Sequence, residues 1–201
     1  EPHLPDRIVT VQKSLEDRKD YCIGTFDAMA SPCEILVDSR DLNLTRRLTQ
    51  IAATEAWRIE DKFSRYNPVS LCAKINGSHG FPVAIDSEIY QLLEFANQCY
   101  LISEGLFDIT SGVLRKTWTF DGSDRLPTSE AVKALLPLIG WQKISYDTSS
   151  ITLPEGMQID FGGIGKEYAV DSCLKKALAI ATNIPILLNF GGDLICNRAR
   201  Y

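Results

Sequence analysis

The order of apolar and polar positions predicts three amphipathic helices. Between Asn43 and Phe63, apolar residues recur every three to four positions, and charged residues such as Glu60 fall mostly on the side expected to face solvent. A second helix is predicted from Ser87 to Glu104, with Gly105 as its stop signal. A third begins after Thr128, which would cap it, and continues to Leu138.

Strands are predicted between these helices. Tyr21–Asp38 alternates like one strand that bends at Pro32, and Phe81–Ile85 reads as a short strand. Residues 142–159 read as a hairpin that leads into the segment beginning at Met157. The apolar run Ile184–Phe190 predicts a buried strand, and the Gly191-Gly192 pair after it suggests a bulge or a close backbone approach.

The segment Met157–Asp171 carries the strongest candidate chemistry. It reads as the end of a strand, a glycine turn and a helix beginning near Lys166. Glycines at 162, 163 and 165 would allow positive φ angles and the approach of a ligand to the backbone. Unpaired N–H groups of the helix and the Lys166 ammonium would favour a phosphate, while Asp160 could fix a polar group of the ligand or help hold a cation.

These glycines could also have a purely structural role in the turn. Their spacing matches neither the dinucleotide-binding fingerprint nor the P-loop, and glycines between a strand and a helix often serve only the turn.

The other candidate residues also have two possible roles, one in ligand binding and one in the fold. The small residues around Met29 could admit a flat ligand or simply allow a bend. Tyr66 could stack on an aromatic ligand or lie half-buried. Asp108 and Thr110 could serve a site or cap the following turn.

Composition narrows the classes of partner. The 201 residues are 45% apolar, which predicts a packed core. Residues 1–20 are expected to form a polar leader before this core. A formal net charge of −5 argues against nucleic acid and anionic membranes as partners, and no apolar run is long enough to span a bilayer.

The six cysteines are scattered without a Cys-x-x-Cys pair, so we expect reduced thiols rather than a zinc site. Reduced thiols and the lack of a visible signal peptide favour a cytoplasmic protein, and a periplasmic one remains open if a leader has been removed.

Five motifs, taken in order, resemble the FAD:protein FMN transferases of the ApbE family. The resemblance covers residues 21–198, treated as one domain that continues to residue 201, and rests on Met29-Ala30-Ser31, Phe63-Ser64-Arg65-Tyr66, Gly105 to Thr110, Ile159 to Lys166 and Gly191-Gly192-Asp193. It implies an α+β fold built around antiparallel sheets. It also implies Mg²⁺-assisted transfer of FMN from FAD to a threonine or serine hydroxyl of a partner flavoprotein, with release of AMP.

The resemblance also implies roles for particular residues. Met29, Tyr66, Leu106, Phe107 and Asp108 would line the FAD site, chiefly around the adenosine. Asp160 and Lys166 would hold the nucleotide and its pyrophosphate as the catalytic pair, and the carbonyl of Gly163 would bind Mg²⁺.

This sequence departs from the family pattern in two places. Glu167 stands where many members have glycine, next to the proposed phosphate site. The family's carboxy-terminal part, with an Asp and Thr pair for Mg²⁺ and a His near the flavin, has no counterpart here. Two alternatives therefore accompany transfer: an FAD-binding scaffold, and an FAD pyrophosphatase that uses water instead of the acceptor hydroxyl.

Overall fold

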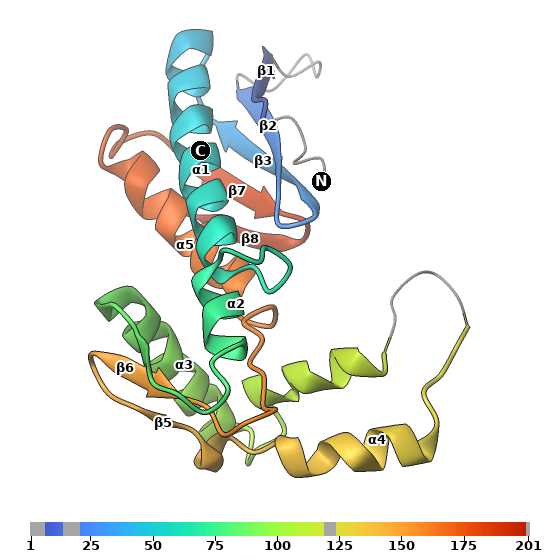
Figure 1. Cartoon of the computed structure of the whole chain (residues 1–201). Coiled ribbons are helices and arrows are strands. Elements are labelled where there is room, and N and C mark those ends of the chain that lie inside the picture. Colours follow the sequence, from blue (N-terminus) through green and yellow to red (C-terminus); the bar gives the residue numbers. More distant parts are fainter. Residues whose placement is uncertain (1–6, 14–20, 119–123, 200–201) are drawn as a thin grey trace. The chain divides into compact units, whose positions relative to one another are not determined.

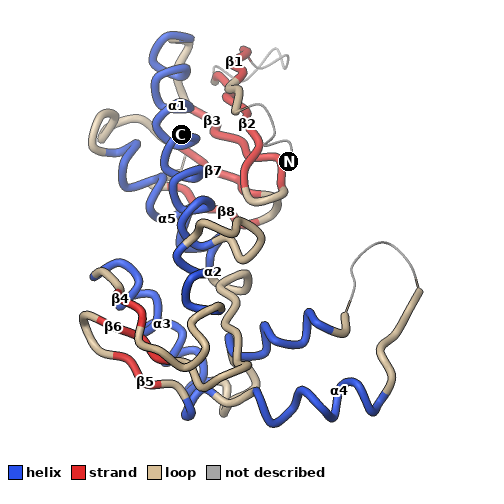
Figure 2. Tube along the Cα trace, viewed as in Figure 1, coloured by secondary structure: helices blue, strands red, loops and turns tan. Residues whose placement is uncertain are grey.

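The computed structural model of this chain describes residues 7–13, 21–118 and 124–199 (Figure 1). They form two compact units: residues up to 61 together with those from 164 onward, and residues 62–163. Each unit contains helices and an antiparallel sheet, which Figure 2 distinguishes by colour. The α+β class predicted from the sequence is confirmed.

The first unit is built on a five-stranded antiparallel sheet. Its order is β1 (Thr10–Lys13), β2 (Cys22–Ala28), β3 (Ser31–Val37), β7 (Ile186–Phe190) and β8 (Asp193–Cys196). Alternate residues of β2, β3 and β7 are buried, as the period of two requires. β1 lies within the segment where the sequence predicted only a polar leader.

One prediction about this sheet is wrong, and another is right in part. Tyr21–Asp38 is not one bent strand but a hairpin, in which Ala28 pairs with Ser31 across Met29 and Ala30. Gly191 and Gly192 form a hairpin turn and not a bulge, since Phe190 pairs with Asp193, but the predicted close approach is present at Gly191, where a Cβ atom would lie 2.9 Å from Ser31 Cβ. Both turns have positive φ at both central positions, 53° and 55° in the first and 64° and 113° in the second. Such turns match the twist of the strands that they join.

Two helices pack on the buried face of this sheet, α1 (Leu42–Phe63) and α5 (Gly165–Leu178). A Cβ atom on Gly24 would lie 1.8 Å from Thr49 Oγ1, so only glycine allows α1 to approach β2 this closely. The Trp57 indole N–H donates to the Asp27 carbonyl at 2.8 Å. α1 therefore forms close to its predicted limits and is fixed to β2.

The second unit contains a small sheet of order β4 (Val83–Ala84), β6 (Ser150–Thr152) and β5 (Ser145–Tyr146). Its helices are α2 (Leu71–Asn76), α3 (Ser87–Ile102), α4 (Ser129–Leu135) and the 3-10 helix η1 (Ile109–Lys116), with shorter 3-10 turns at Leu136–Leu138 and Trp141–Lys143. Helix α2 was not predicted.

Side-chain caps explain where the helices of this unit begin. The side chains of Ser70, Asp86 and Thr128 accept hydrogen bonds from backbone N–H groups in the first turns of α2, α3 and α4. The predicted start after Thr128 is therefore confirmed. The predicted hairpin is also present as β5 and β6, although it is much shorter than residues 142–159.

One buried carboxylate joins the two helices of the first unit. Glu55 on α1 is 2% exposed and accepts hydrogen bonds from Arg58 at 2.8 Å and from Ser172 on α5 at 2.6 Å, while the Lys176 ammonium lies 2.6 Å away. These bonds, first of all that from Arg58, lower the pKa of Glu55 from 4.5 to about 2, although burial acts in the opposite direction.

Glu55→Gln should therefore reduce stability at neutral pH and much less in acid. Because folding lowers the pKa, the carboxylate stabilises the fold above about pH 4.5, and this contribution disappears as the pH falls towards 2. We expect a loss of about 3 kcal/mol at pH 7 from urea unfolding. The exposed Glu155 gives the control variant Glu155→Gln. An equal loss for Glu55→Gln at pH 7 and pH 3 would contradict this account.

Candidate functional site

The segment Met157–Phe161 pairs with no strand among the residues that the structure describes. Met157, Ile159 and Phe161 are buried, and Gln158 and Asp160 are partly exposed. The predicted alternation of side chains is therefore present, but the predicted strand is not, because no neighbouring strand supplies backbone hydrogen bonds. Other groups must satisfy the buried peptide groups of this segment.

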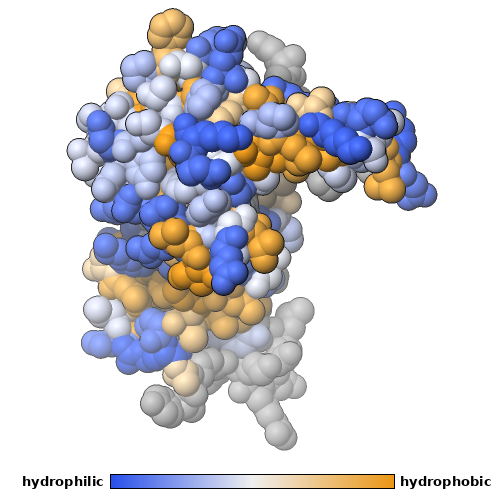
Figure 3. Space-filling view, turned by 90° about the horizontal axis from the view of Figure 1, so that it is seen from below, coloured by the Kyte–Doolittle hydropathy of each residue, from blue (hydrophilic) through white to orange (hydrophobic). Residues whose placement is uncertain are grey.

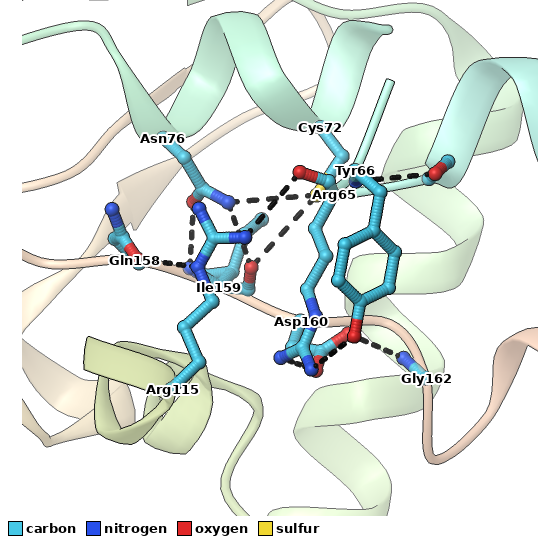
Figure 4. Close-up of polar contacts among 10 residues, drawn as sticks. Arg65, Tyr66, Cys72, Asn76, Arg115, Gln158, Ile159, Asp160 and Gly162 are labelled. Carbon is cyan, nitrogen blue, oxygen red and sulfur yellow. Dashed lines mark hydrogen bonds and ion pairs between the residues drawn. The ribbon is translucent and has the colours of Figure 1, made fainter. Parts of the chain in front are cut away.

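Asn76 at the end of α2 takes the place of a neighbouring strand. Its amide donates to the Ile159 carbonyl at 2.9 Å and accepts from the Ile159 N–H at 2.7 Å (Figure 4). The next N–H, that of Asp160, donates to the Ile109 carbonyl at 2.9 Å. Three consecutive backbone groups are thus bonded, which fixes the direction in which Asp160 leaves the backbone.

Close packing holds the same segment from two further sides. A Cβ atom on Gly112 of η1 would lie 2.8 Å from Asp160 Cβ, so the segment runs directly over this glycine. The Phe161 ring contacts Phe63 in an edge-to-face arrangement with centroids 5.5 Å apart. Phe63 ends α1, and its contact places the following loop close to Asp160.

Arg65 in that loop joins Asp160 to Tyr66. Its guanidinium forms an ion pair with Asp160 Oδ2 and donates from Nη2 to the Tyr66 hydroxyl at 2.8 Å (Figure 4). The guanidinium carbon also lies 4.9 Å from the centre of the Tyr66 ring, in cation–π range. The Arg65 side chain is 16% exposed, whereas Tyr66 is 76% exposed. Tyr66 is therefore anchored on one side and open to solvent elsewhere.

The glycine turn after Asp160 differs from its prediction. None of Gly162, Gly163 and Gly165 has a positive φ angle. The first two are needed for close approach instead: a Cβ on Gly162 would lie 3.1 Å from Asp160 Oδ1, and one on Gly163 would lie 3.0 Å from the Phe107 ring. The Gly162 N–H donates to the same Asp160 Oδ1 at 2.9 Å. Both carboxylate oxygens of Asp160 are thus engaged.

The loop after α3 contains the next three predicted site residues. Asp108 caps η1: one carboxylate oxygen accepts from the Thr110 N–H at 2.8 Å, and the other accepts from the Trp141 N–H at 3.0 Å. The capping alternative is therefore correct, and it leaves the ligand role untested. Phe107 lies against Gly163, as described above. Leu106 is 92% exposed.

Large apolar side chains are exposed at this end of α3. Besides Leu106, Leu101 and Ile102 are 63% and 84% exposed. Figure 3 shows hydrophobic side chains between charged ones on the face of the molecule seen from below. Apolar surface of this kind is available to a ligand or a protein partner.

Lys166 lies in the first turn of α5, in the first unit. Its ammonium donates to Ser31 Oγ at 2.6 Å, and no carboxylate among the described residues pairs with it. No side chain caps the start of α5 at Ile164. The partly buried charge and the free N–H groups of the first turn together favour an anion. Glu167, beside Lys166, is exposed.

The Met29 turn lies in the same unit and is held by α1. The Met29 N–H donates to Glu60 Oε1 at 2.9 Å. The sequence predicted that Glu60 lies on the solvated side of the helix, but Glu60 is partly buried. This burial raises the pKa of its carboxyl group. This contact helps to hold Met29 and Ala30 at φ angles that residues other than glycine rarely adopt. Ser31, the partner of Lys166, follows directly.

The described residues contain no cluster of three or more His, Cys, Asp or Glu side chains able to hold a metal ion. Gly163, the predicted Mg²⁺ ligand, is an exposed turn residue. All six cysteines are free, as predicted, and four of them are buried. Among the described helices, none combines the length and apolar character needed to cross a membrane.

The predicted site residues therefore fall into two sets. Met29 and Lys166 belong to the first unit, and Tyr66, Leu106, Phe107, Asp108, Asp160 and Gly163 belong to the second. Sequence reasoning missed Arg65 and Asn76. Arg65 lies inside the motif Phe63-Ser64-Arg65-Tyr66, next to the predicted site residue Tyr66. That position could have indicated a role for Arg65 in the site. Asn76 lies outside the five motifs, so the sequence offered no such signal for it.

Comparisons with known proteins agree on one family. The family model described as "ApbE family" matches residues 29–199. A relative from Chlamydia pneumoniae named "FAD:protein FMN transferase" is 31% identical over 124 residues, which are 59% of this chain and 39% of the relative. A protein of the same name from Treponema pallidum is 29% identical over 66% of this chain and 39% of its own length.

Solved structures give a similar result for the fold. The apbe protein of Thermotoga maritima superposes with a TM-score of 0.82 at 28% identity, over 90% of this chain and 60% of that protein. The flavinyl transferase ApbE of Pseudomonas stutzeri, at 21% identity, superposes with a TM-score of 0.77 over 90% of this chain and 59% of its own. The chain thus spans about two fifths to three fifths of the relatives that it matches.

Replacing Asn76 should loosen the Asp160 segment. Asn76→Ala leaves both backbone groups of Ile159, which is 1% exposed, without their partner, and we expect a loss of stability of about 2 kcal/mol. Hydrogen exchange of the Ile159 amide should accelerate. Gln158→Ala is the control, because that side chain accepts a hydrogen bond from the exposed Arg115 and not from the Ile159 backbone. Unchanged exchange at Ile159 would show that Asn76 does not hold the segment.

Proposed function

Because the chain belongs to the ApbE family, we propose that it is part of a flavin transferase that moves FMN from FAD to a threonine or serine hydroxyl of a partner flavoprotein, releasing AMP. The family match covers most of the chain, and the relatives that carry this activity in their names are longer.

Lys166 gives the main structural support for binding a pyrophosphate. Its ammonium is partly buried and has Ser31 Oγ as its hydrogen-bond partner, without a carboxylate among the described residues. A charge held in this way is stabilised by an anion, and the uncapped N–H groups of α5 act in the same direction. A dinucleotide with two linked phosphates supplies the anion that fits.

Residues of the second unit support the remaining FAD contacts. Tyr66 presents an exposed aromatic ring, and Leu106 and Phe107 offer apolar surface for a planar ligand. Asp160 is held with its carboxylate next to the glycine turn. We assign Met29 and Asp108 to the same ligand from the resemblance. Met29 contributes through a rigid turn, and Asp108 fixes the loop that carries Phe107.

The proposed step is a displacement at phosphorus. The acceptor hydroxyl oxygen forms a bond to the phosphorus of the FMN half, while the bond from that phosphorus to the bridging oxygen breaks. AMP leaves with the bridging oxygen, and the hydroxyl proton is released. Positioning and charge neutralisation supply most of the catalysis in such reactions, so Lys166 would counter phosphate charge and Asp160 would keep the nucleotide in register.

The resemblance also implies Mg²⁺, which would neutralise phosphate charge if the phosphates of FAD supplied most of its ligands. Among the described residues, the carbonyl of Gly163 is the proposed donor, and the Asp160 carboxylate is already engaged by Arg65 and Gly162. These donors do not form a metal site by themselves, because Mg²⁺ requires about six oxygen ligands. No part of the step above depends on it.

The decisive experiment follows the fate of FAD. The protein is incubated with FAD, Mg²⁺ and a candidate acceptor, and the products are separated by chromatography and mass spectrometry. Transfer predicts a mass increase of the acceptor by one FMN and an equal amount of AMP. Free FMN with AMP would identify a pyrophosphatase, and bound but intact FAD would identify a scaffold; either result would overturn the transfer proposal.

Lys166→Ala should weaken FAD binding much more than riboflavin binding. The ammonium meets phosphate, and hydrogen bonds to charged groups contribute about 1.5–3 kcal/mol, so we expect about a tenfold to hundredfold loss for FAD. Titration calorimetry with both ligands measures this difference. Lys175→Ala, an exposed lysine on the same helix, is the control. Equal losses for FAD and riboflavin would indicate a structural role instead.

A further inference from the structure

Arg65 has three contacts that together link Asp160 and Tyr66, two of the polar groups assigned to the ligand in the second unit. It pairs with Asp160, donates to the Tyr66 hydroxyl and lies over the Tyr66 ring (Figure 4). We propose that Arg65 is a positioning residue of the nucleotide site, which sets the orientation of the Asp160 carboxylate and of the Tyr66 ring at once. This inference rests on the proposed function for the identity of the ligand.

The geometry explains why an arginine suits this position. Its planar guanidinium offers several N–H donors in fixed directions, so one side chain can serve a carboxylate and a phenol simultaneously. Lysine carries its donors on one nitrogen, so it could keep the ion pair but could not at the same time lie flat over the Tyr66 ring. The two contacts to Tyr66 act together, because the hydroxyl bond prevents the ring from rotating away from the guanidinium.

Exposure indicates which side of this arrangement receives a ligand. Arg65 is mostly buried, with its side chain 16% exposed, and Asp160 is 27% exposed. Tyr66 is 76% exposed even though its hydroxyl is bonded. A tyrosine that is fixed and yet uncovered is suited to stack on a planar group, because little conformational freedom is lost when the ligand binds. We identify that group by its chemistry as the aromatic ring of a nucleotide.

The backbone reinforces the same arrangement. Asp160 Oδ1 accepts from the Gly162 N–H, so the carboxylate that Arg65 orients also closes the turn that follows it. Arg115 supports the loop by donating to the Arg65 carbonyl at 3.5 Å and to the Gln158 side chain at 3.2 Å. Loss of the Arg65 guanidinium should therefore affect the Gly162 amide, which Arg65 does not touch.

The test compares Arg65→Met, Arg65→Lys and Tyr66→Phe, with Lys74→Met as a control that removes the same charge from an exposed position on α2. The first readout requires no ligand: hydrogen exchange of the Gly162 amide should accelerate in Arg65→Met and stay unchanged in Lys74→Met. The second is FAD affinity, which should fall about tenfold in Arg65→Met, by analogy with other charge-assisted bonds. Arg65→Lys should restore slow exchange but not full affinity.

A double-mutant cycle then isolates the link to Tyr66. If Arg65 orients the ring, the losses of affinity from Arg65→Met and Tyr66→Phe should be less than additive. Additive losses, or an unchanged Gly162 amide in Arg65→Met, would overturn the inference. A fall in thermal stability that accounts for the whole loss of affinity would also overturn it, in favour of a purely structural role.

The outcomes for function and for Arg65 are distinguishable. A wild-type protein that binds no FAD contradicts the proposed function, and the exchange of the Gly162 amide still decides whether Arg65 positions Asp160. A wild-type protein that binds FAD, with Arg65→Met binding it as tightly as Lys74→Met does, contradicts the inference alone.

Discussion

The candidate site of the second unit depends on a segment that pairs with no strand in the described part of the chain. Buried peptide groups need hydrogen-bond partners, and in Met157–Phe161 the Asn76 amide and the Ile109 carbonyl supply them. No described strand pairs with either edge of this segment. The Arg65 guanidinium can therefore reach the Asp160 carboxylate, and Gly112 can pack closely against the Asp160 backbone.

Side-chain contacts, and not a sheet, determine how the candidate charged groups are oriented. A carboxylate on a regular strand is oriented by the sheet, whereas Asp160 is oriented by an ion pair and by the turn that follows it. The same principle operates in the first unit, where Ser31 orients the Lys166 ammonium and Glu60 holds the preceding turn. Both candidate charged groups are thus positioned before any ligand binds, and this lowers the cost of binding.

Much of the fold could be predicted from the sequence because it follows from hydrophobic periodicity and capping. The limits of α1 and the start of α4 after Thr128 are examples. The predictions failed where turns decide the structure. Met29 and Ala30 adopt φ angles that favour glycine, so nothing in their side chains indicated a hairpin. At Gly162 and Gly163 the residue type was informative, but the cause is close contact with Asp160 and Phe107 and not a positive φ angle.

The contacts that hold the candidate site were less predictable. The resemblance named site residues, but it could not show that Asn76 and Arg65 hold their segment, because those contacts join positions 83 and 95 residues apart in the sequence. The pyrophosphate position is the central claim, and a crystal structure of the protein with FAD tests it most directly. Our account predicts a phosphate oxygen within hydrogen-bonding distance of Lys166 Nζ. Bound FAD whose phosphates lie away from Lys166, with the ammonium still held by Ser31 alone, would contradict it.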